Sequence, residues 1–313
     1  MKLQQLRYLC EIANQDLNLS KAAKTLHTSQ PGISKQIQLL EEELKVKIFI
    51  RNGKRIVKIT PPGEAILKIA RKMMQDTENL KRISQEFTHE AGGTLIIATT
   101  HTQARYVLPT VIKRFTVRYP DIKLILRQGS PTQISTLVTS GEADIAIATE
   151  AIELFHELVM LPCYEWNRCI VVPPKHPLLR LKELTLEAIT QYPIITYDFA
   201  FTGRSKTNQA FESKGLSPNV VLTAIDSDVI KTYVELGLGI GILAKMAFDP
   251  KRDKHLRSID ASHLFESSTT RIGISRNSYL RRYIFDFIEM FAPHLTETTI
   301  RTALQKRLEH PKS

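Results

Sequence analysis

The sequence predicts a multidomain α/β protein, and three observations support this fold class. Near the N-terminus, two short amphipathic segments flank a tight turn and lead into a β-hairpin signal. A long segment follows that carries apolar residues at every seventh position. After residue 92, short apolar runs alternate with amphipathic segments, as strands and helices do in α/β layers. The 313 residues are therefore expected to form two or three compact units.

Residues 1–60 predict three helices before the hairpin. The first covers residues 3–14, and a tight turn at 27–28 separates the second from the third. Ser29 caps the third helix, and Pro31 is tolerated in its first turn because the missing N–H has no intrahelical partner there. The second helix has one apolar face, formed by Leu19, Ala22, Ala23 and Leu26. The third has a predicted buried face, formed by Ile33, Ile37, Leu40 and Leu44.

Two short helices around a tight turn predict a helix-turn-helix, whose second helix can lie in a DNA major groove. The start and outward face of that helix carry hydroxyls, amides and a lysine, which can reach base edges and phosphates. A solvated helix of an ordinary helical domain is the alternative. The candidate DNA contacts on this helix are Ser29, Gln30, Pro31, Ser34, Lys35 and Gln38.

A basic hairpin directly after these helices favours DNA as the partner. Asn52-Gly53 lies between the apolar segments 48–50 and 56–59, which is a hairpin signal. A hairpin in this place is a wing, suited to contact with phosphates or the minor groove. Its candidate DNA contacts are Arg51, Lys54 and Arg55.

Charge and hydropathy limit the class of protein. The net charge is +11, and residues 1–60 contribute 11 Lys and Arg against 5 Asp and Glu. Positive charge concentrated in one unit indicates a nucleic-acid partner, although many basic proteins bind none. The N-terminus lacks the apolar run of a signal peptide, and no stretch of about 18 apolar residues is present. A cytoplasmic protein without a membrane partner is expected.

Residues 61–91 predict one long helix, which begins at Pro61-Pro62-Gly63 and ends before Gly92-Gly93. A seven-residue apolar repeat on an isolated helix indicates a partner helix. Packing of this helix on its own domain is the alternative. The candidate dimerisation residues are Ile66, Ile69, Met73, Leu80, Ile83 and Phe87.

The rest of the chain predicts α/β layers, in which ligands bind at the carboxyl ends of strands. Strands are expected at 94–99, 123–128, 143–148, 168–172, 194–197, 220–224, 240–243 and 271–275. Helices are expected up to about 119, after 130–131, and at 204–214, 228–236 and 279–290. Gly237-Leu-Gly239-Ile-Gly241 is interpreted as a helix-to-strand connection, because its spacing does not fit a nucleotide loop and no helix follows it.

Polar residues gather where these strands end. Residues 99–105 place threonine hydroxyls and an amide at the positive start of a helix, which suits a small anion or carboxylate. Simple N-capping by Thr100 or Thr102 is the alternative. The segments 128–133, 148–150 and 197–204 are further polar strand ends that we expect to converge on one cleft with Trp166 as an apolar wall.

No catalytic or metal-binding pattern accompanies these residues, so neither an enzyme nor a metal cofactor is expected. His101 is interpreted as a hydrogen-bonding residue at a helix start, with general-base chemistry as the alternative. Cys10 falls on the apolar face of the first helix. Cys163 and Cys169 are interpreted as structural residues, with redox sensing as the alternative. Neither has an evident resolving partner.

The first 60 residues resemble the winged helix of LysR-type transcriptional regulators. The resemblance implies a DNA-binding domain over 1–60, a dimerisation helix over 61–91 and an effector-binding domain over 92–313. It also implies two lobes like those of periplasmic binding proteins, lobe I at about 92–162 and 269–295 and lobe II at about 163–268. The matching residues include Leu6-Arg7-Tyr8, Ala22-Ala23, Ser29-Gln30-Pro31, Ile33-Ser34, Leu40-Glu41, Phe49 and Thr60-Pro61-Pro62-Gly63.

Further segments resemble the CysB and Cbl subgroup of that family. They are 99–106, 128–133, 148–151, 161–164, 166–168, 201–204, 228–234 and 291–296. This resemblance implies an activator of sulfur-assimilation and cysteine-biosynthesis genes that responds to N-acetylserine or to a sulfate- or thiosulfate-like anion. The alternative is a Cbl-like regulator of sulfonate and other sulfur use that responds to a sulfated nucleotide or sulfate.

The same resemblance implies the partners and the site. The partners are double-stranded promoter DNA, RNA polymerase and further copies of the chain in a homodimer or homotetramer, and no cofactor beyond the effector is implied. Asp198 and Ala200 depart from the family pattern, which has a neutral polar residue and a glycine there, so ligand preference stays open. The implied effector-binding residues are Thr100, Thr102, Gln103, Thr149, Trp166 and Thr202.

Overall fold

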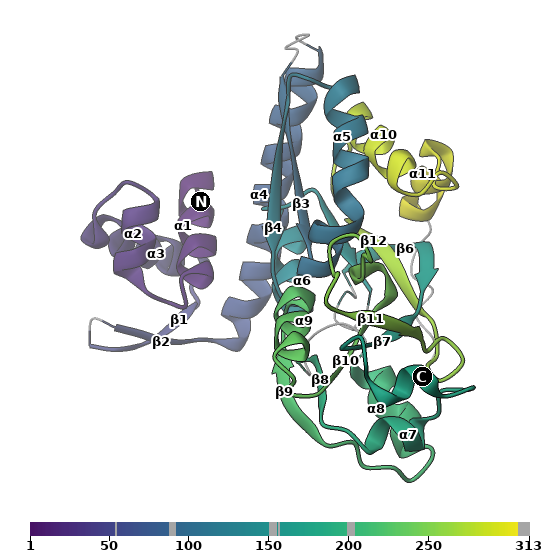
Figure 1. The fold of residues 1–313 in the computed structure, drawn as a ribbon. Helices are drawn as coiled ribbons and strands as arrows, with labels where there is room; N and C mark the ends of the chain where they lie inside the picture. Colours follow the sequence, from purple (N-terminus) through teal and green to yellow (C-terminus); the bar gives the residue numbers. More distant parts are fainter. Residues whose placement is uncertain (54, 88–91, 150–154, 156, 199–203, 306–313) are drawn as a thin grey trace, which may run out of the picture. The chain divides into compact units, whose positions relative to one another are not determined.

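The computed structural model confirms the predicted α/β multidomain class (Figure 1). It describes residues 1–313 except 54, 88–91, 150–154, 156, 199–203 and 306–313. The chain divides into two compact units, Met1–His89 with Asn277–Tyr279, and Glu90–Arg276 with Leu280–Ser313. None of the described helices is both long and apolar enough to cross a membrane.

The first unit contains the predicted helices and wing. Asn18 accepts the N–H groups of Ser20 and Lys21 to cap the second helix, and Ser29 accepts the N–H of Gly32 at 3.2 Å to cap the third. The elements are α1 Leu3–Asn14, α2 Leu19–Thr25, α3 Gln30–Leu44, β1 Phe49–Asn52, β2 Arg55–Ile59 and α4 Pro61–Phe87. The wing therefore turns after Asn52, which pairs with Arg55 as the last rung of the ladder.

One core prediction for α3 is wrong. Ile33, Ile37 and Leu40 are fully buried, but Leu44 is 36% exposed because the helix runs past the core at its last turn. The neighbouring Glu41 is buried instead. Its carboxylate accepts the backbone N–H groups of Ile48 and Phe49, at 2.8 and 3.1 Å, and so anchors the start of the wing to α3.

The long helix α4 uses part of its apolar repeat within its own unit. Leu67 and Ala70 are buried in the same core as α1 and α3, and Ile66 and Met73 pack against it. Ile69 and Leu80, by contrast, are 62% and 68% exposed. Ile83 is half-buried, and the side chain of Phe87 lies outside the described residues. The repeat thus packs on its own unit at Ile66 and Met73, while Ile69 and Leu80 remain exposed.

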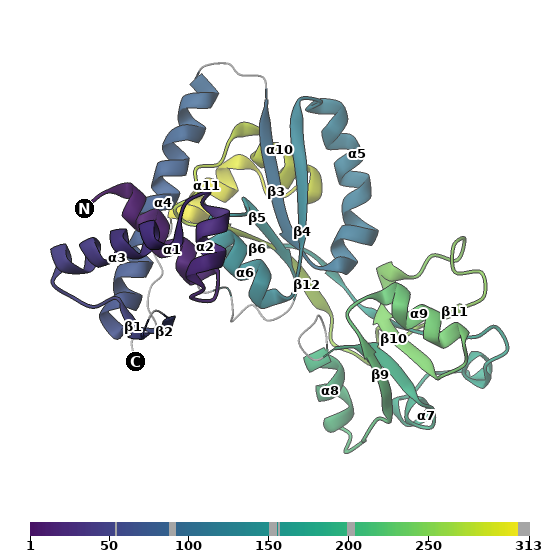
Figure 2. The ribbon, with the colours of Figure 1, turned by 90° about the vertical axis from the view of Figure 1, so that its left-hand side faces the viewer.

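The second unit contains two five-stranded sheets (Figures 1 and 2). We call the sheet β4-β3-β5-β12-β6 with its helices the first lobe, and the sheet β11-β7-β10-β8-β9 with its helices the second lobe. The strands of the first lobe are β3 Gly93–Thr99, β4 Ile122–Gln128, β5 Ile145–Ala148, β6 Leu158–Trp166 and β12 Ser268–Ser275. Those of the second are β7 Arg168–Val172, β8 Ile194–Tyr197, β9 Val220–Ala224, β10 Ile240–Ala244 and β11 Arg257–Asp260.

Helices cover both faces of each sheet. In the first lobe, α5 and α10 share one core with the sheet and α6 packs on its other side (Figure 2). In the second lobe, α9 lies on one face, and α7 and α8 contribute to the core on the other. The helices are α5 Leu108–Arg118, α6 Pro131–Thr139, α7 Leu186–Thr190, α8 Arg204–Glu212, α9 Ser227–Glu235, α10 Arg282–Phe291 and α11 Glu297–Gln305.

The structure confirms the predicted strands and the return of the late strand to the first sheet, and it adds β6, β11, α7 and α11. The glycine-rich segment after α9 is the predicted helix-to-strand connection. A Cβ at Gly239 would lie 2.3 Å from the carbonyl oxygen of Pro193, and Gly237 has a φ of +79°. These glycines therefore serve close packing and a left-handed turn.

Candidate functional site

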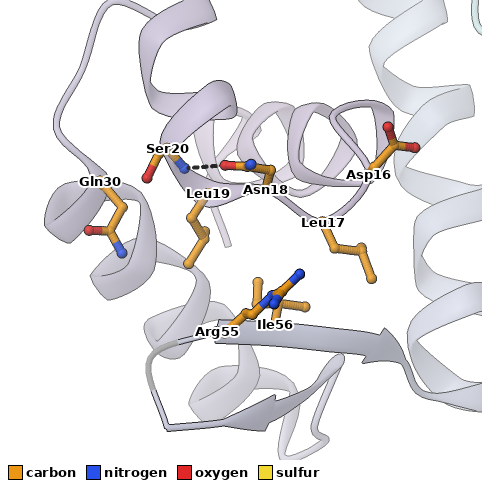
Figure 3. Close-up of a pocket in the computed structure, with 8 residues that line it drawn as sticks. All are labelled: Asp16, Leu17, Asn18, Leu19, Ser20, Gln30, Arg55 and Ile56. Atoms are coloured by element: carbon orange, nitrogen blue, oxygen red, sulfur yellow. Dashed lines mark hydrogen bonds between the residues drawn. The ribbon is translucent and has the colours of Figure 1, made fainter.

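The third helix and the wing of the first unit share an open groove (Figure 3). The groove has a volume of about 360 Å³, and its lining includes Gln30 from α3, Arg55 from β2 and Ser20 from α2. These side chains are an amide, a guanidinium and a hydroxyl, which are groups that bind phosphate oxygens and base edges. The groove thus places a predicted helix contact and a predicted wing contact on one surface.

A direct bond also connects the wing with the third helix. One N–H of the Arg51 guanidinium donates to the Ser34 hydroxyl at 3.1 Å, and both side chains are half-buried. This bond fixes the wing against α3, so these two residues have a structural role beside any contact with DNA. Lys54 lies outside the described residues. The other predicted DNA contacts are accessible on this unit: Ser29, Pro31, Lys35, Gln38 and Arg55 are exposed, and Gln30 is half-buried.

In the second unit, the turn after β3 brings the predicted effector residues together. Thr100, Thr102 and Gln103 are 4%, 7% and 1% exposed. The Thr100 hydroxyl has no hydrogen-bond partner among the described residues. Thr99, by contrast, donates to the carbonyl oxygen of Ile147 at 3.1 Å and so belongs to the sheet. The turn therefore buries a hydroxyl that is unpaired within the described structure.

Gln103 is the centre of a buried polar cluster. Its amide N–H donates to the Thr270 hydroxyl at 3.1 Å, and the Tyr164 hydroxyl donates to its carbonyl oxygen at 2.6 Å. The Thr149 and Thr270 hydroxyls lie 3.3 Å apart. Tyr164 and Thr270 were not predicted as site residues, because their polar groups come from β6 and β12, far from the turn in sequence. The cluster thus links Gln103 and Thr149 through the Thr270 hydroxyl.

The second lobe meets this turn through Tyr197, at the end of β8. Its buried hydroxyl forms a hydrogen bond with the Thr102 side chain and lies 2.7 Å from the Ser227 hydroxyl. It also accepts the backbone N–H of Ala244. Asp198 follows, and its carboxylate accepts the Thr223 hydroxyl on the neighbouring strand β9. The predicted contact Thr202 lies outside the described residues.

Trp166 ends β6, and it is 9% exposed. Its indole N–H has no partner among the described residues. Arg168 stacks on the ring at 5.3 Å and donates to the carbonyl oxygen of Glu266 and the hydroxyl of Ser268. The buried Arg168 guanidinium therefore holds the ring of Trp166, the predicted pocket wall. The indole N–H of Trp166 remains unpaired within the described structure.

The cysteines do not have the character of redox sensors. Burial raises the pKa of the Cys163 thiol to about 12 and those of Cys10 and Cys169 to about 11. The reactive thiolate is therefore strongly disfavoured near neutral pH. Within the part of the chain that the structure describes, no group of three His, Cys, Asp or Glu side chains is arranged to hold a metal ion.

Comparison with known proteins shows the same two-part organisation. Residues 3–64 match the family of bacterial regulatory helix-turn-helix proteins, lysR family, and residues 88–296 match the LysR substrate binding domain. The chain is 53% identical over 306 residues to the HTH-type transcriptional regulator SsuR of Burkholderia cenocepacia, covering 98% of this chain and 99% of SsuR. It is 53% identical over 307 residues to the HTH-type transcriptional regulator CysB of Haemophilus influenzae, covering 98% of this chain and 95% of CysB.

A solved structure agrees with this relation. The cofactor-binding domain of the Cbl transcriptional regulator is 44% identical, with a TM-score of 0.67, and the match covers 69% of this chain and 96% of that domain. The residues that line the groove of Figure 3 all fall within the helix-turn-helix match. The buried cluster around Gln103 falls within the second match. The chain therefore belongs to the LysR family of DNA-binding transcription regulators and is closely related to its sulfur-related members SsuR, CysB and Cbl.

Proposed function

We propose that this regulator activates sulfur-assimilation and cysteine-biosynthesis genes when a small anion such as N-acetylserine occupies the cleft. The observation that carries the proposal is the pair of buried donors, the Thr100 hydroxyl and the Trp166 indole N–H, without partners among the described residues. An unpaired buried donor costs free energy, so such a site suits a ligand that accepts hydrogen bonds. The effector-binding residues of this proposal are Thr100, Thr102, Gln103, Thr149, Trp166 and Thr202.

A second candidate is a Cbl-like regulator of sulfonate and other sulfur use that responds to a sulfated nucleotide or sulfate. The similarity to the Cbl cofactor-binding domain favours it. Calorimetric titration of the full chain with N-acetylserine, O-acetylserine, thiosulfate, sulfate and adenosine phosphosulfate separates the two. N-acetylserine should bind and change the length of the footprint on promoter DNA. Tightest binding by adenosine phosphosulfate would select the second candidate, and no binding by any of them would reject both.

The DNA part of the proposal assigns sequence reading to α3 and phosphate contact to the wing. Gln30→Ala should reduce discrimination between operator and random DNA, because a base contact carries about 1–3 kcal/mol. Arg55→Ala should weaken binding to both and reduce its salt dependence, because fewer counterions are released. Fluorescence anisotropy at several salt concentrations measures both effects, and RNA polymerase is the proposed further partner at the promoter.

The exposed part of α4 is the proposed dimerisation surface, with a homotetramer as the larger assembly. Ile69 and Leu80 are exposed apolar residues on this helix, and a partner helix would bury them. Leu80→Asp should yield monomers in light scattering and weaken operator binding. Thr77→Asp on the same helix is the control for added charge, since Thr77 lies off the apolar repeat. Intact oligomers in Leu80→Asp would place the interface elsewhere.

A further inference from the structure

One turn of the first lobe carries candidate effector-binding residues and also contacts the second lobe. After β3, His101 and Thr102 begin a helix that continues as the π-helix η1, Gln103–Val107. The N–H of Leu108 donates to the carbonyl of Gln103, five residues earlier, and Pro109 has no N–H with which to continue the ladder. Such π-turns are frequent at functional sites.

The far side of this turn binds the start of α9 in the second lobe. His101 Nε2 lies 3.1 Å from a carboxylate oxygen of Asp226, the residue that caps α9. Arg105 Nε donates to one oxygen of Asp228 at 3.2 Å, and the Tyr106 hydroxyl donates to the other at 2.5 Å. We call these three contacts the lobe clasp. They connect the turn that carries Thr102 to a helix more than 100 residues later.

Asp228 is also held from its own lobe. Lys231 Nζ lies 3.0 Å from Asp228 and 2.9 Å from Asp253, and it donates to the carbonyl oxygen of Ala247 at 3.0 Å. The same ammonium lies 5.2 Å from the centre of the Tyr106 ring, which packs into the core of the second lobe. Burial acts to raise the pKa of Asp228, but the hydrogen bonds from Tyr106 and Lys231 outweigh it and keep that pKa low. The acid therefore stays ionised in its place.

We propose that Asp228 is a positioning residue for effector binding, which acts through the clasped turn and not on the effector itself. It fixes Thr102 and Gln103 relative to Tyr197 on the opposite lobe, and so preorganises the cleft. If only the clasped arrangement binds the effector well, the apparent affinity depends on the fraction of chains in that arrangement. This inference rests on the proposed function of the cleft.

The sign of the effect separates positioning from direct electrostatics. A carboxylate close to an anionic effector repels it, so removal of the charge from a direct contact would tighten binding. Removal of the clasp instead loosens the cleft and weakens binding. Tyr106→Phe tests the clasp without a change of charge, because it removes the hydroxyl that donates to Asp228 and keeps the aromatic ring.

The test measures effector affinity and amide hydrogen exchange on the full chain. We expect Asp228→Asn and Tyr106→Phe each to weaken binding of N-acetylserine roughly five- to tenfold. Thiosulfate, the second probe, should lose the same factor, and the double variant should lose no more than the worse single one. Without any effector, exchange should rise in residues 101–107 and 226–231. Asp260→Asn, which breaks the exposed ion pair with Lys245 inside the second lobe, is the control and should change neither readout.

Three results would overturn the proposal. Tighter anion binding by Asp228→Asn would indicate direct repulsion. Unequal losses for the two probes would indicate a specific ligand contact. Unchanged hydrogen exchange in both variants would show that the clasp does not hold the turn, whether or not any effector binds. If the parent binds neither probe while exchange rises in both variants, the proposed effector is wrong and the clasp remains.

Discussion

Two strand-to-helix turns at the same edge of the first sheet have similar chemistry and different roles. β3 and β4 are parallel neighbours, and each ends in a turn rich in Thr, Ser and Gln. After β4, the side chains of Ser130 and Gln133 each accept the other's backbone N–H, which caps α6. After β3, Thr100 keeps a buried hydroxyl without a described partner, and Gln103 bonds side chains from two other strands. The two turns thus share a polar composition, and burial distinguishes the candidate site from the cap.

The largest effect is expected at Thr100. Thr100→Val should reduce effector affinity about tenfold to a hundredfold, because a hydrogen bond to a charged group contributes about 1.5–3 kcal/mol. Thermal stability should not fall, since the variant replaces an unpaired hydroxyl with a methyl group. Calorimetry and thermal unfolding measure the two effects. Thr132→Val, on an exposed position of the other turn, is the matched control, and equal affinities for all three proteins would remove the contrast between the turns.

The next effect concerns the glutamines of the two turns. Gln103→Leu removes one partner of the half-buried Tyr164 hydroxyl and one partner of Thr270, so the free energy of unfolding should fall by about 1–3 kcal/mol. Urea denaturation measures this loss. Gln133→Leu is the control, because its side chain is exposed and should cost less than half as much. Equal losses would mean that the buried cluster does not stabilise the fold.

A smaller effect follows from Ser130. Ser130→Ala should lower the free energy of unfolding by about 1 kcal/mol, the usual contribution of an N-cap. Effector affinity should stay unchanged, because this turn uses its polar groups on its own helix. A weakened effector response in this variant would instead make the second turn part of the cleft.

The smallest effect is expected at Gly129. A Cβ at this position would lie 2.9 Å from the Gln133 side-chain oxygen and 3.0 Å from the Gln133 Cβ, and this exposed residue can shift by a few tenths of an ångström. Gly129→Ala should therefore change the free energy of unfolding by no more than about 0.5 kcal/mol. A loss well above this in urea denaturation would show that the capping box is rigid.

Local patterns predicted most of the secondary structure, and the failures have local causes. The strand β6 was missed because Pro162 interrupts its apolar run; as an edge strand it tolerates a proline, and its pairing with β12 shifts there. Leu44 was predicted to be buried from helical periodicity, which does not reveal where the core ends. Glu41 was overlooked because a buried acid is read as a surface residue until its N–H partners are known.

Part of the candidate site was predictable from residues that are close in sequence. Thr100, Thr102 and Gln103 were identified from one turn. Thr270, the partner of Gln103, and Asp228, the partner of Arg105 and Tyr106, come from a strand and a helix over 100 residues away, and no spacing rule connects them to the turn. The clasp was missed for this reason. His101, interpreted as a hydrogen-bonding residue at a helix start, has its Nε2 atom 3.1 Å from a carboxylate oxygen of Asp226.

The place of β12 in the first sheet has a consequence for the order of folding. This strand lies between β5 and β6, yet it is made after the entire second lobe. Until it emerges from the ribosome, β5 has a free edge whose four residues are all buried in the finished protein. All strands of the second lobe lie between β6 and β12 in sequence. The second lobe is therefore fully synthesised before the last strand of the first lobe, β12. We therefore expect the second lobe to fold before the first. Until β12 pairs with β5, the free edge of β5 is prone to aggregation.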